Sequence, residues 1–279
     1  MNTTVSILCD NNISRSGFIG EHGFSALIER GQDKYLFDTG PGLSLPLNLK
    51  TLGKNLAGLK KIFLSHGHYD HTGGLKWAIE QTGKIEVVAH PAVFANHMRF
   101  DPQKPLVPPK YIGCPFTQRA LEGLGARFAF KDHTEEAAPG LWFLSGIDRD
   151  PEKLPEDTRL VLKQGDGLVP DPLSDDASLL LKTDTSPVLL LGCAHTGILN
   201  ILDYVQNTVG ITSLRAVLGG THLMFYGPDA LNRAIKRLDE FAVDVIAVSH
   251  CTGMGAAIRL ANHFGDRFVP ASAGAVFNF

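Results

Sequence analysis

The sequence predicts a mixed α/β sandwich, with β-sheets inside and helices on the outer faces. Short β-rich runs follow one another early in the chain, whereas later runs alternate with helical patterns. The 29 glycines and 16 prolines among 279 residues indicate many short connections between compact elements. Hydrophobic residues make up 44% and charged residues 20%, a balance that supports a large core and excludes bulk disorder.

Strands are predicted where β-branched, aromatic and leucine residues form short runs that end at glycine, proline or polar residues. The predicted strands are Val5–Cys9, Phe24–Glu29, Lys34–Phe37, Ile62–Ser65, Ile85–Ala89, Phe128–Phe130, Leu141–Leu144, Ser178–Leu181, Val188–Leu191, Ala216–Leu218, Val243–Val248 and Ala275–Phe277. Helical periodicity is clearest late in the chain, where apolar residues recur at i, i+3, i+4 and i+7 over 198–209 and 231–241. Pro228 stands at the expected start of the second helix. Shorter helices are expected after Gly73 and near Pro91 and Phe116.

The domain organisation is predicted to be one domain over residues 1–279, with halves of about 1–130 and 177–279. A similarity between two short segments of the chain supports two related halves. Ile62-Phe-Leu-Ser-His66 and Ile246-Ala-Val-Ser-His250 are both apolar strands that end in Ser-His.

A loop-rich insertion of about 90–175 separates the core elements of the two halves. Residues 101–115 hold five prolines and are predicted to be irregular, and the highly charged residues 148–176 are predicted to form a long surface loop. Long loops often act as lids or binding segments, although long surface loops without such a role are also common. Three cations of the insertion can meet an anionic substrate or remain solvated surface charges: Arg99, Lys110 and Arg149.

The net charge, the apolar runs and the cysteine spacing limit the partners and the location that we expect for this protein. The formal charge of −3 gives no broad positive field, so we expect no nucleic-acid partner. The N-terminus lacks a signal-peptide pattern, and no apolar run approaches the roughly 20 residues of a spanning helix. We therefore expect a cytoplasmic protein without a membrane partner. The four widely spaced cysteines form no CxxC pair and are interpreted as free thiols or single metal ligands.

The strongest chemical signal is the segment Ser65-His-Gly-His-Tyr-Asp-His-Thr-Gly-Gly74, directly after an apolar strand. His66 and His68 can point to one side as an extended chain leaves a sheet, and Asp70 and His71 follow on a turn. Imidazole and carboxylate ligands suit Zn²⁺, Mn²⁺ or Fe and do not suit Ca²⁺. A solvated polar loop is the alternative, but four potential ligands at this spacing favour a metal site.

The HxHxDH motif resembles the signature of the metallo-β-lactamase superfamily. That resemblance implies a four-layer αβ/βα sandwich, with two mixed sheets inside, helices outside, and one or two metal ions at one end of the sheets. Further motifs resemble one group in particular, that of the dihydropterin-6-yl-methyl-(β-D-ribofuranosyl)aminobenzene 5′-phosphate synthase of the methanopterin pathway. These motifs are Glu21–Ser25, Leu36–Gly40, Gly192–Gly197, Gly219–Leu223 and His250–Gly253.

The resemblance implies two sets of metal ligands. They are His66, His68 and His195 for a first ion, and Asp70, His71 and His250 for a second. His195 comes shortly after a predicted strand, and His250 ends another, where the superfamily places its last histidine. The alternative for both is a histidine that only forms hydrogen bonds in a turn.

The sequence departs from the superfamily pattern at two positions. The usual third histidine before Ser178 is absent, because that place reads Ser174-Asp-Asp-Ala177, and Cys193 replaces the usual bridging aspartate. Either Asp176 or Cys193 can be a ligand, and a small buried cysteine is an equal alternative for Cys193. These departures leave open whether the site holds one ion or two.

Other candidate residues flank the predicted site. His222 can bind substrate phosphate, move protons, touch metal or be structural, and Asp38 can orient a ligand histidine or cap its loop. Glu21 and His22 lie near a glycine turn and can shape the pocket. The remaining histidines have no partners in sequence and are expected to be ordinary: His90, His97, His133 and His263.

The leading functional hypothesis is a metal-dependent hydrolase with one or two Zn²⁺ ions, Fe or Mn being alternatives. The ion lowers the pKa of a water toward about 7, and the resulting hydroxide attacks an ester, amide or phosphoester of a small molecule, for which an anionic substrate is one alternative. Asp70 is expected to be both ligand and catalytic orienting group. The alternatives are a condensing synthase, which is a transferase, an iron-dependent redox enzyme, and a metal-stabilised binding module without catalysis.

Overall fold

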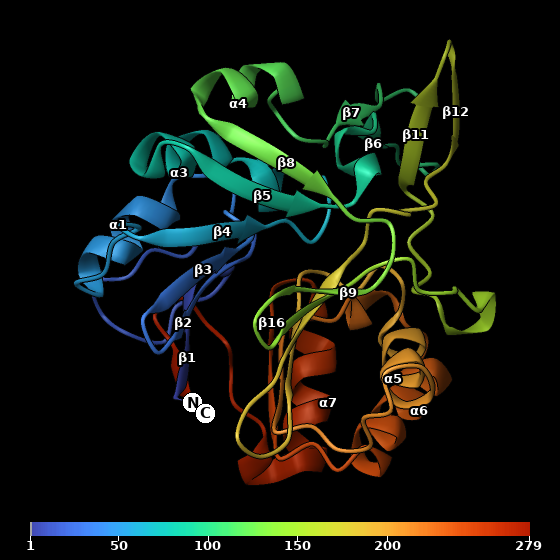
Figure 1. The fold of residues 1–279 in the computed structure, drawn as a ribbon. Helices are drawn as coiled ribbons and strands as arrows, with labels where there is room; N and C mark the ends of the chain where they lie inside the picture. Colours follow the sequence, from blue (N-terminus) through green and yellow to red (C-terminus); the bar gives the residue numbers. More distant parts are fainter. Residues whose placement is uncertain (1) are drawn as a thin grey trace.

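The computed structural model describes residues 2–279, which form two large β-sheets flanked by helices (Figure 1). The strands of the first sheet are β1 (Thr3–Cys9), β2 (Ser25–Arg30), β3 (Asp33–Phe37), β4 (Leu59–Phe63), β5 (Ile85–Ala89), β8 (Ala126–Phe130) and β17 (Val276–Asn278). Those of the second sheet are β9 (Glu135–Ala138), β10 (Leu141–Leu144), β13 (Ser178–Leu181), β14 (Val188–Leu191), β15 (Ala216–Gly220) and β16 (Val245–Ser249). The spatial orders are β17-β1-β2-β3-β4-β5-β8 and β16-β15-β14-β13-β10-β9.

Both large sheets are mixed. Strands β3, β4, β5 and β8 run parallel in the first sheet, as β14, β15 and β16 do in the second. The remaining pairs are antiparallel. Because parallel strands end at the same edge, the segments that follow β14, β15 and β16 leave the second sheet together.

Helices cover the outer faces of both sheets (Figure 1). On the first sheet these are α1 (Ser44–Thr51), α3 (Leu75–Thr82) and α4 (Gln118–Leu124), and on the second α5 (Ile198–Asn207), α6 (Pro228–Glu240) and α7 (Met254–Phe264). The one-turn helix α2 (Tyr69–Thr72) and short 3₁₀ helices fill the connections: η1 (Pro91–Phe94), η2 (Pro151–Lys153), η3 (Leu223–Phe225), η4 (His250–Thr252) and η5 (Gly265–Arg267). No helix in the described part of the chain is long and apolar enough to cross a membrane.

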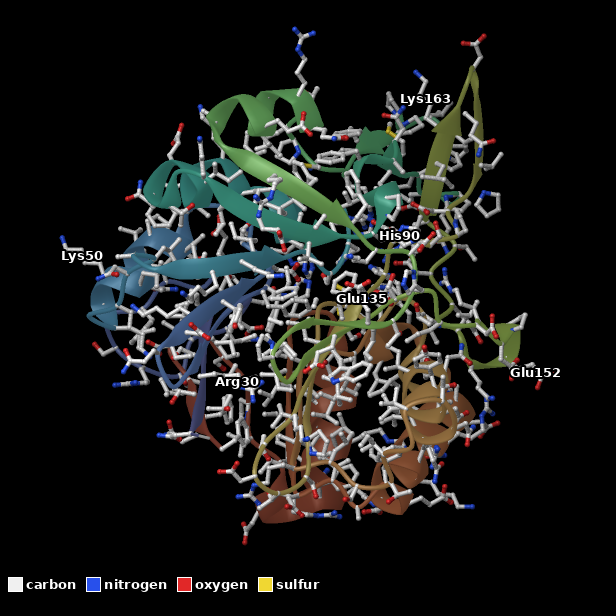
Figure 2. The ribbon with its side chains drawn as sticks, viewed as in Figure 1. Arg30, Lys50, His90, Glu135, Glu152 and Lys163 are labelled. Carbon is white, nitrogen blue, oxygen red and sulfur yellow. The ribbon has the colours of Figure 1, made fainter. Side chains whose placement is uncertain are left out.

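The central core lies between the two sheets, where side chains of β1 to β4 meet those of β10, β13, β14 and β15. Phe37, Phe63 and Phe143 are fully buried there, and the rings of Phe63 and Phe143 lie 6.3 Å apart. Complete burial of such a side chain contributes about 1.5–3 kcal/mol. Arg30 joins the sheets at the far end of β2, where it donates to Pro139 O and Lys182 O (Figure 2).

The insertion corrects one sequence-based expectation, because residues 148–176 are not a plain surface loop. They contain η2 and a hairpin of β11 (Leu160–Gln164) and β12 (Gly167–Pro170), with Lys163 on the projecting hairpin (Figure 2). The hairpin continues into a third, four-stranded sheet through β6 (His97–Arg99) and β7 (Lys110–Tyr111), in the order β12-β11-β6-β7. β7 also interrupts the proline-rich segment that was expected to be irregular. A two-residue turn joins β11 to β12. Gly165, at φ +58°, occupies its first position, where a positive φ is favourable for glycine.

The predicted strands of the two large sheets are present, some to the residue and others with ends shifted by up to three positions. Three shifts matter for the site, because β4 ends at Phe63 and β16 at Ser249, while β15 extends to Gly220. Each strand is therefore followed within three residues by a histidine. Helices α1 and α7 were not predicted, because Pro46 and the small residues Gly253 and Gly255 obscure their patterns.

Candidate metal centre

The HxHxDH segment leaves the first sheet after β4 and turns into α2. His66 follows β4 by three residues and His68 stands on extended backbone, whereas Asp70 and His71 lie within the helical turn. Gly67 between them has no room for a side chain, since an added Cβ would lie 2.1 Å from Val93 O. This close approach fixes the path of the chain, so that all four side chains reach the same buried region.

The first side of the site consists of His66, His68 and His195. One ring nitrogen from each of the three residues lies within 4.8 Å of the others, and His66 Nε2 is 3.0 Å from His68 Nδ1. The sequence-predicted His195 thus meets the motif across 127 residues of chain. Burial lowers the pKa of all three imidazoles, that of His68 to about 3, so each ring is neutral and offers a lone pair.

Several ring nitrogens on this side have no hydrogen-bond partner. His68 Nε2 and both nitrogens of His195 are buried and unpaired within residues 2–279. Leaving buried polar atoms unpaired costs about 1–3 kcal/mol each, so native proteins rarely do so without a reason. A cation between the three rings accounts for their neutral state, their convergence and their missing partners together. The donor set therefore fits a bound metal ion.

The second side of the site consists of Asp70, His71 and His250. His71 Nε2 and His250 Nε2 lie 3.3 Å apart, and Asp70 Oδ2 lies 3.5 Å from His250 Nε2 and 3.9 Å from His71 Nε2. The two Ser-His strand ends noted in the sequence therefore meet around His71. Its ring centroid lies 4.1 Å from that of His66, which follows β4, and 5.2 Å from that of His250, which follows β16 in the other large sheet.

Cys193 lies between the two sides. Its Sγ is 3.3 Å from His71 Nε2, and it shares candidate ligand clusters with His66, His195 and His250. Burial raises the pKa of the Cys193 thiol, so a thiolate there needs a neighbouring cation to offset the cost of burial.

Asp38 supports both sides from behind. Its Oδ2 lies 2.7 Å from His71 Nδ1 and accepts from Ser65 Oγ at 2.6 Å, while Oδ1 accepts from the Ser65 N–H at 2.7 Å. Ser65 Oγ in turn lies 2.8 Å from His66 Nδ1. Burial opposes a charge on His71, but Asp38 and Asp70 outweigh it and raise its pKa to about 9. The same negative field favours a metal cation at His71 Nε2.

His250 is held by the loop that follows β1. Its N–H donates to Asp10 Oδ2 at 2.9 Å, and its Nδ1 lies 2.9 Å from Asn11 Oδ1. These contacts orient Nε2 toward His71. Burial lowers the pKa of His250 to about 3, which keeps that nitrogen available as a ligand.

The lower-ranked sequence candidates lie beside the first side. Asp176 Oδ2 accepts from the N–H of Thr196, the residue after His195, at 2.7 Å, and burial raises the Asp176 pKa to about 6. The ring of His222 lies 4.2 Å from that of His195, and both His222 nitrogens are buried without a hydrogen-bond partner in the described part of the chain. Its Nε2 is 3.8 Å from Asp157 Oδ2. Asp176 is thus placed to hold the His195 loop, whereas His222 faces the site directly.

One histidine that the sequence left as ordinary, His97, is part of the site's support. Its Nδ1 is 2.6 Å from Asp171 Oδ2, its Nε2 is 3.4 Å from Asp175 Oδ2, and its ring lies 5.2 Å from that of His68. Asp175 Oδ2 also accepts from the Gly67 N–H at 2.7 Å. The adjacent carboxylates of Asp175 and Asp176 before β13 were the available sequence signal. His90, by contrast, only caps η1 (Figure 2).

The two sides form the floor of a pocket of about 760 Å³. The candidate ligands that line it are His68, Asp70, Cys193, His195 and His250, together with His222. This volume is in the range of small-molecule sites. A metal ion held at the floor would therefore face a space open to an incoming ligand.

Comparisons with known proteins identify the family and the fold of the chain. Residues 19–250 match the family model described as Metallo-beta-lactamase superfamily. The 7,8-dihydropterin-6-methyl-4-(beta-D-ribofuranosyl)-aminobenzene-5'-phosphate synthase of Methanocaldococcus jannaschii is 30% identical over 274 residues, 95% of this chain and 92% of that protein. The crystal structure of Tm1679, described as a metal-dependent hydrolase of the beta-lactamase superfamily, superposes with a TM-score of 0.83 and 26% identity, covering 99% of this chain and 98% of that one. Zn²⁺-bound PqqB from Methylobacterium extorquens, at a TM-score of 0.56, 12% identity and coverage of 98% and 99%, shares the fold.

Proposed function

We propose that this chain, which belongs to the metallo-β-lactamase superfamily, is a metal-dependent hydrolase of a small molecule that carries an ester, amide or phosphoester bond. The observation that carries the proposal is the convergence of the first and second sides on the floor of one open pocket. The chain's likeness to Tm1679, a metal-dependent hydrolase, supports the same reaction class.

The two sides divide the proposed ligands between two ions. His66, His68 and His195 would hold the first, and Asp70, His71 and His250 would hold the second. Cys193, whose Sγ lies 3.3 Å from His71 Nε2, would be a further ligand. When bound, such ions supply Lewis acidity and lower the pKa of a water toward about 7. Imidazole and thiolate donors favour Zn²⁺ or Fe over Mn²⁺. We therefore propose zinc as the resident metal.

Asp70 is the proposed catalytic group among this chain's own residues. Its carboxylate is only 11% exposed but reaches the pocket, where Oδ2 can accept a hydrogen bond from the attacking water and orient it. His22 Nε2 lies 3.4 Å from the same oxygen and is 64% exposed. His22 is thus placed to pass a proton between Asp70 and solvent.

The proposal is tested first by elemental analysis of protein purified without added metal or chelator. One or two equivalents of zinc, together with hydrolysis of at least one member of a nitrophenyl ester, phosphomonoester and phosphodiester panel, are expected. Metal-free protein that stays inactive after zinc is added would reject the proposal.

Asp70→Asn separates the orienting role from folding. The substitution keeps size and one oxygen, so we expect turnover and second-ion occupancy to fall together while the melting temperature of the metal-free protein is unchanged. His133→Gln, at an exposed histidine outside the pocket, is the matched control. Full activity at full metal content in Asp70→Asn would reject this role.

A second candidate function is favoured by one comparison, the 30% identity to a synthase over 95% of this chain. In this alternative the pocket holds two substrates, and an arylamine nitrogen replaces water as the attacking group. Incubation with a dihydropterin carrying a pyrophosphate leaving group and an aminobenzene ribotide distinguishes the two reactions. A condensed product with release of pyrophosphate supports the synthase, whereas a pterin alcohol supports the hydrolase.

A further inference from the structure

Two unpaired cations stand at the rim of the pocket, on the third sheet. Arg99 of β6 and Lys110 of β7 are direct cross-strand partners, and both line the pocket. Like charges directly opposite each other destabilise a strand pair. Neither side chain has an ion-pair or hydrogen-bond partner in the described residues 2–279. The fold thus keeps a repulsive pair for which the described residues provide no compensating anion.

Two nearby cations of the insertion differ from this pair. Arg159, which lines the same pocket, makes two hydrogen bonds of 2.7 Å to Asp157, and Lys104 lies 4.0 Å from Asp101. Their charges are compensated within the chain. The charges of Arg99 and Lys110 remain available to an external anion.

The cationic pair has a fixed relation to the pocket floor. The Lys110 ammonium lies 5.9 Å from the ring centre of Tyr69, the residue before Asp70. The Tyr69 N–H also donates to Ile112 O at 2.8 Å, which ties the segment after β7 to the HxHxDH segment. An anion held by the pair would therefore be positioned relative to the reacting groups.

A different part of the pocket is apolar. Met224 of η3 and Met254 and Ile258 of α7 line it and are 53–69% exposed, unusually high for large apolar side chains. Figure 1 shows that α7 covers the second sheet, away from β6 and β7. Methionine side chains adapt to flat ring systems and make favourable sulfur–aromatic contacts.

We propose that the pocket recognises an aromatic small molecule that bears a phosphate-like dianion. The dianion binds between Arg99 and Lys110, and the ring body lies on the wall of Met224, Met254 and Ile258. This inference rests on the proposed function and deepens it, since it assigns the substrate class to the same pocket. Two adjacent cations suit the charge of a phosphate monoester better than that of a carboxylate.

The test uses the metal-loaded protein and a pair of probes that differ in charge. 1-Naphthylmethylphosphonate cannot be hydrolysed to a phosphate, and 1-naphthalenemethanol is its neutral counterpart. Calorimetric titration is expected to show tighter binding of the phosphonate. The double variant Arg99→Gln/Lys110→Gln should weaken phosphonate binding about tenfold or more and leave the alcohol unchanged, because only the charge contacts are lost. Lys104→Gln, on an exposed cation of the same insertion, should change neither.

The metal floor can also bind a phosphonate, and the double variant separates that contribution. Unchanged phosphonate affinity in the double variant, or an equal loss for both probes, would overturn the proposal. Met254→Ser/Ile258→Ser should instead lower the affinities for both probes by a similar factor. Affinities equal to those of the wild type would contradict the proposed role of Met254 and Ile258 in binding the ring. Metal content is measured in every variant. If the proposed function is wrong, the protein will lack metal or will show no turnover. If only this inference is wrong, metal and turnover will be present, but the double variant will not change the ratio of the phosphonate affinity to the alcohol affinity.

Discussion

The two sides of the candidate metal centre are built differently. The first side offers three neutral imidazoles, of which His195 has no hydrogen-bond partner on either ring nitrogen among the residues that the structure describes. The second side adds the carboxylate of Asp70, and its two imidazoles are each held from behind, His71 by Asp38 and His250 by Asn11. A divalent ion on the second side would therefore lie next to a negative charge and to ligands that are already oriented. An ion on the first side would have less nearby negative charge and less firmly oriented ligands.

This difference predicts that the two proposed ions are held with different strength. Charge compensation and pre-oriented ligands both favour the second side, and the first side depends more on Cys193 and on Ser65, which links His66 to Asp38. The HxHxDH motif therefore supplies ligands to two sides that differ in charge and in ligand support. Substitutions on each side are the way to separate them.

The largest effect is expected from removing an inner ligand on either side. His66→Ala and His71→Ala should each lower kcat/KM by more than about 100-fold, the upper end for residues that act only from behind a ligand. Metal counts should differ, however. His66→Ala should retain about one ion, because Asp70, His71 and His250 of the tighter second side all remain. His71→Ala should retain less than about one, because it loses a second-side ligand and keeps only the more weakly binding first side intact. Elemental analysis after gel filtration measures both.

Each of these two variants also needs a control for folding, because the side chains are buried. Circular dichroism spectra and melting curves of the metal-free proteins serve that purpose. Equal metal loss in His66→Ala and His71→Ala would contradict the inequality of the two sides.

Asp38→Asn is expected to have an intermediate effect and to act on both sides. Asparagine keeps the size and tolerates the backbone conformation at φ +55°, but it removes the charge that favours a cation at His71. We expect a loss of about 10–100-fold in metal affinity or activity, the usual range for such partners. Asp132→Asn, at an exposed acidic residue, is the matched control. Unaltered affinity for both ions would show that Asp38 only caps its loop.

The sequence predicted the parts of the site that are local or that follow strands. His66, His68, Asp70 and His71 are contiguous, and their convergence follows from how an extended chain turns into a helix. Most strands of the two large sheets were predicted because each contains a short β-rich run that ends at glycine, proline or polar residues, and the family resemblance supplied their arrangement in two sheets.

Apart from Asp38, which was expected to orient a ligand histidine and lies against His71, the supporting residues were not predicted, because they depend on contacts between distant residues. Asn11 meets His250 across 239 residues, and Asp175 meets Gly67 across 108. A single Asp or Asn after a strand carries no sequence signal of such a partner. The third sheet was missed for a related reason, since its strands are short, partly exposed and do not follow a hydrophobic pattern.

The smallest effect is expected from Asp175→Asn, which sharpens the comparison because it should act on the first side alone. Asp175 accepts from the Gly67 N–H between His66 and His68 and contacts His97, but it makes no contact with the second side. Asparagine retains an acceptor oxygen, so the loss should be near the low end for supporting residues, about tenfold in first-ion affinity. Competition with a graded chelator series should show the weaker ion released earlier than in wild type and the tighter ion unchanged. Earlier release of both ions would mean that Asp175 stabilises the whole HxHxDH segment, and the two sides would then share their support.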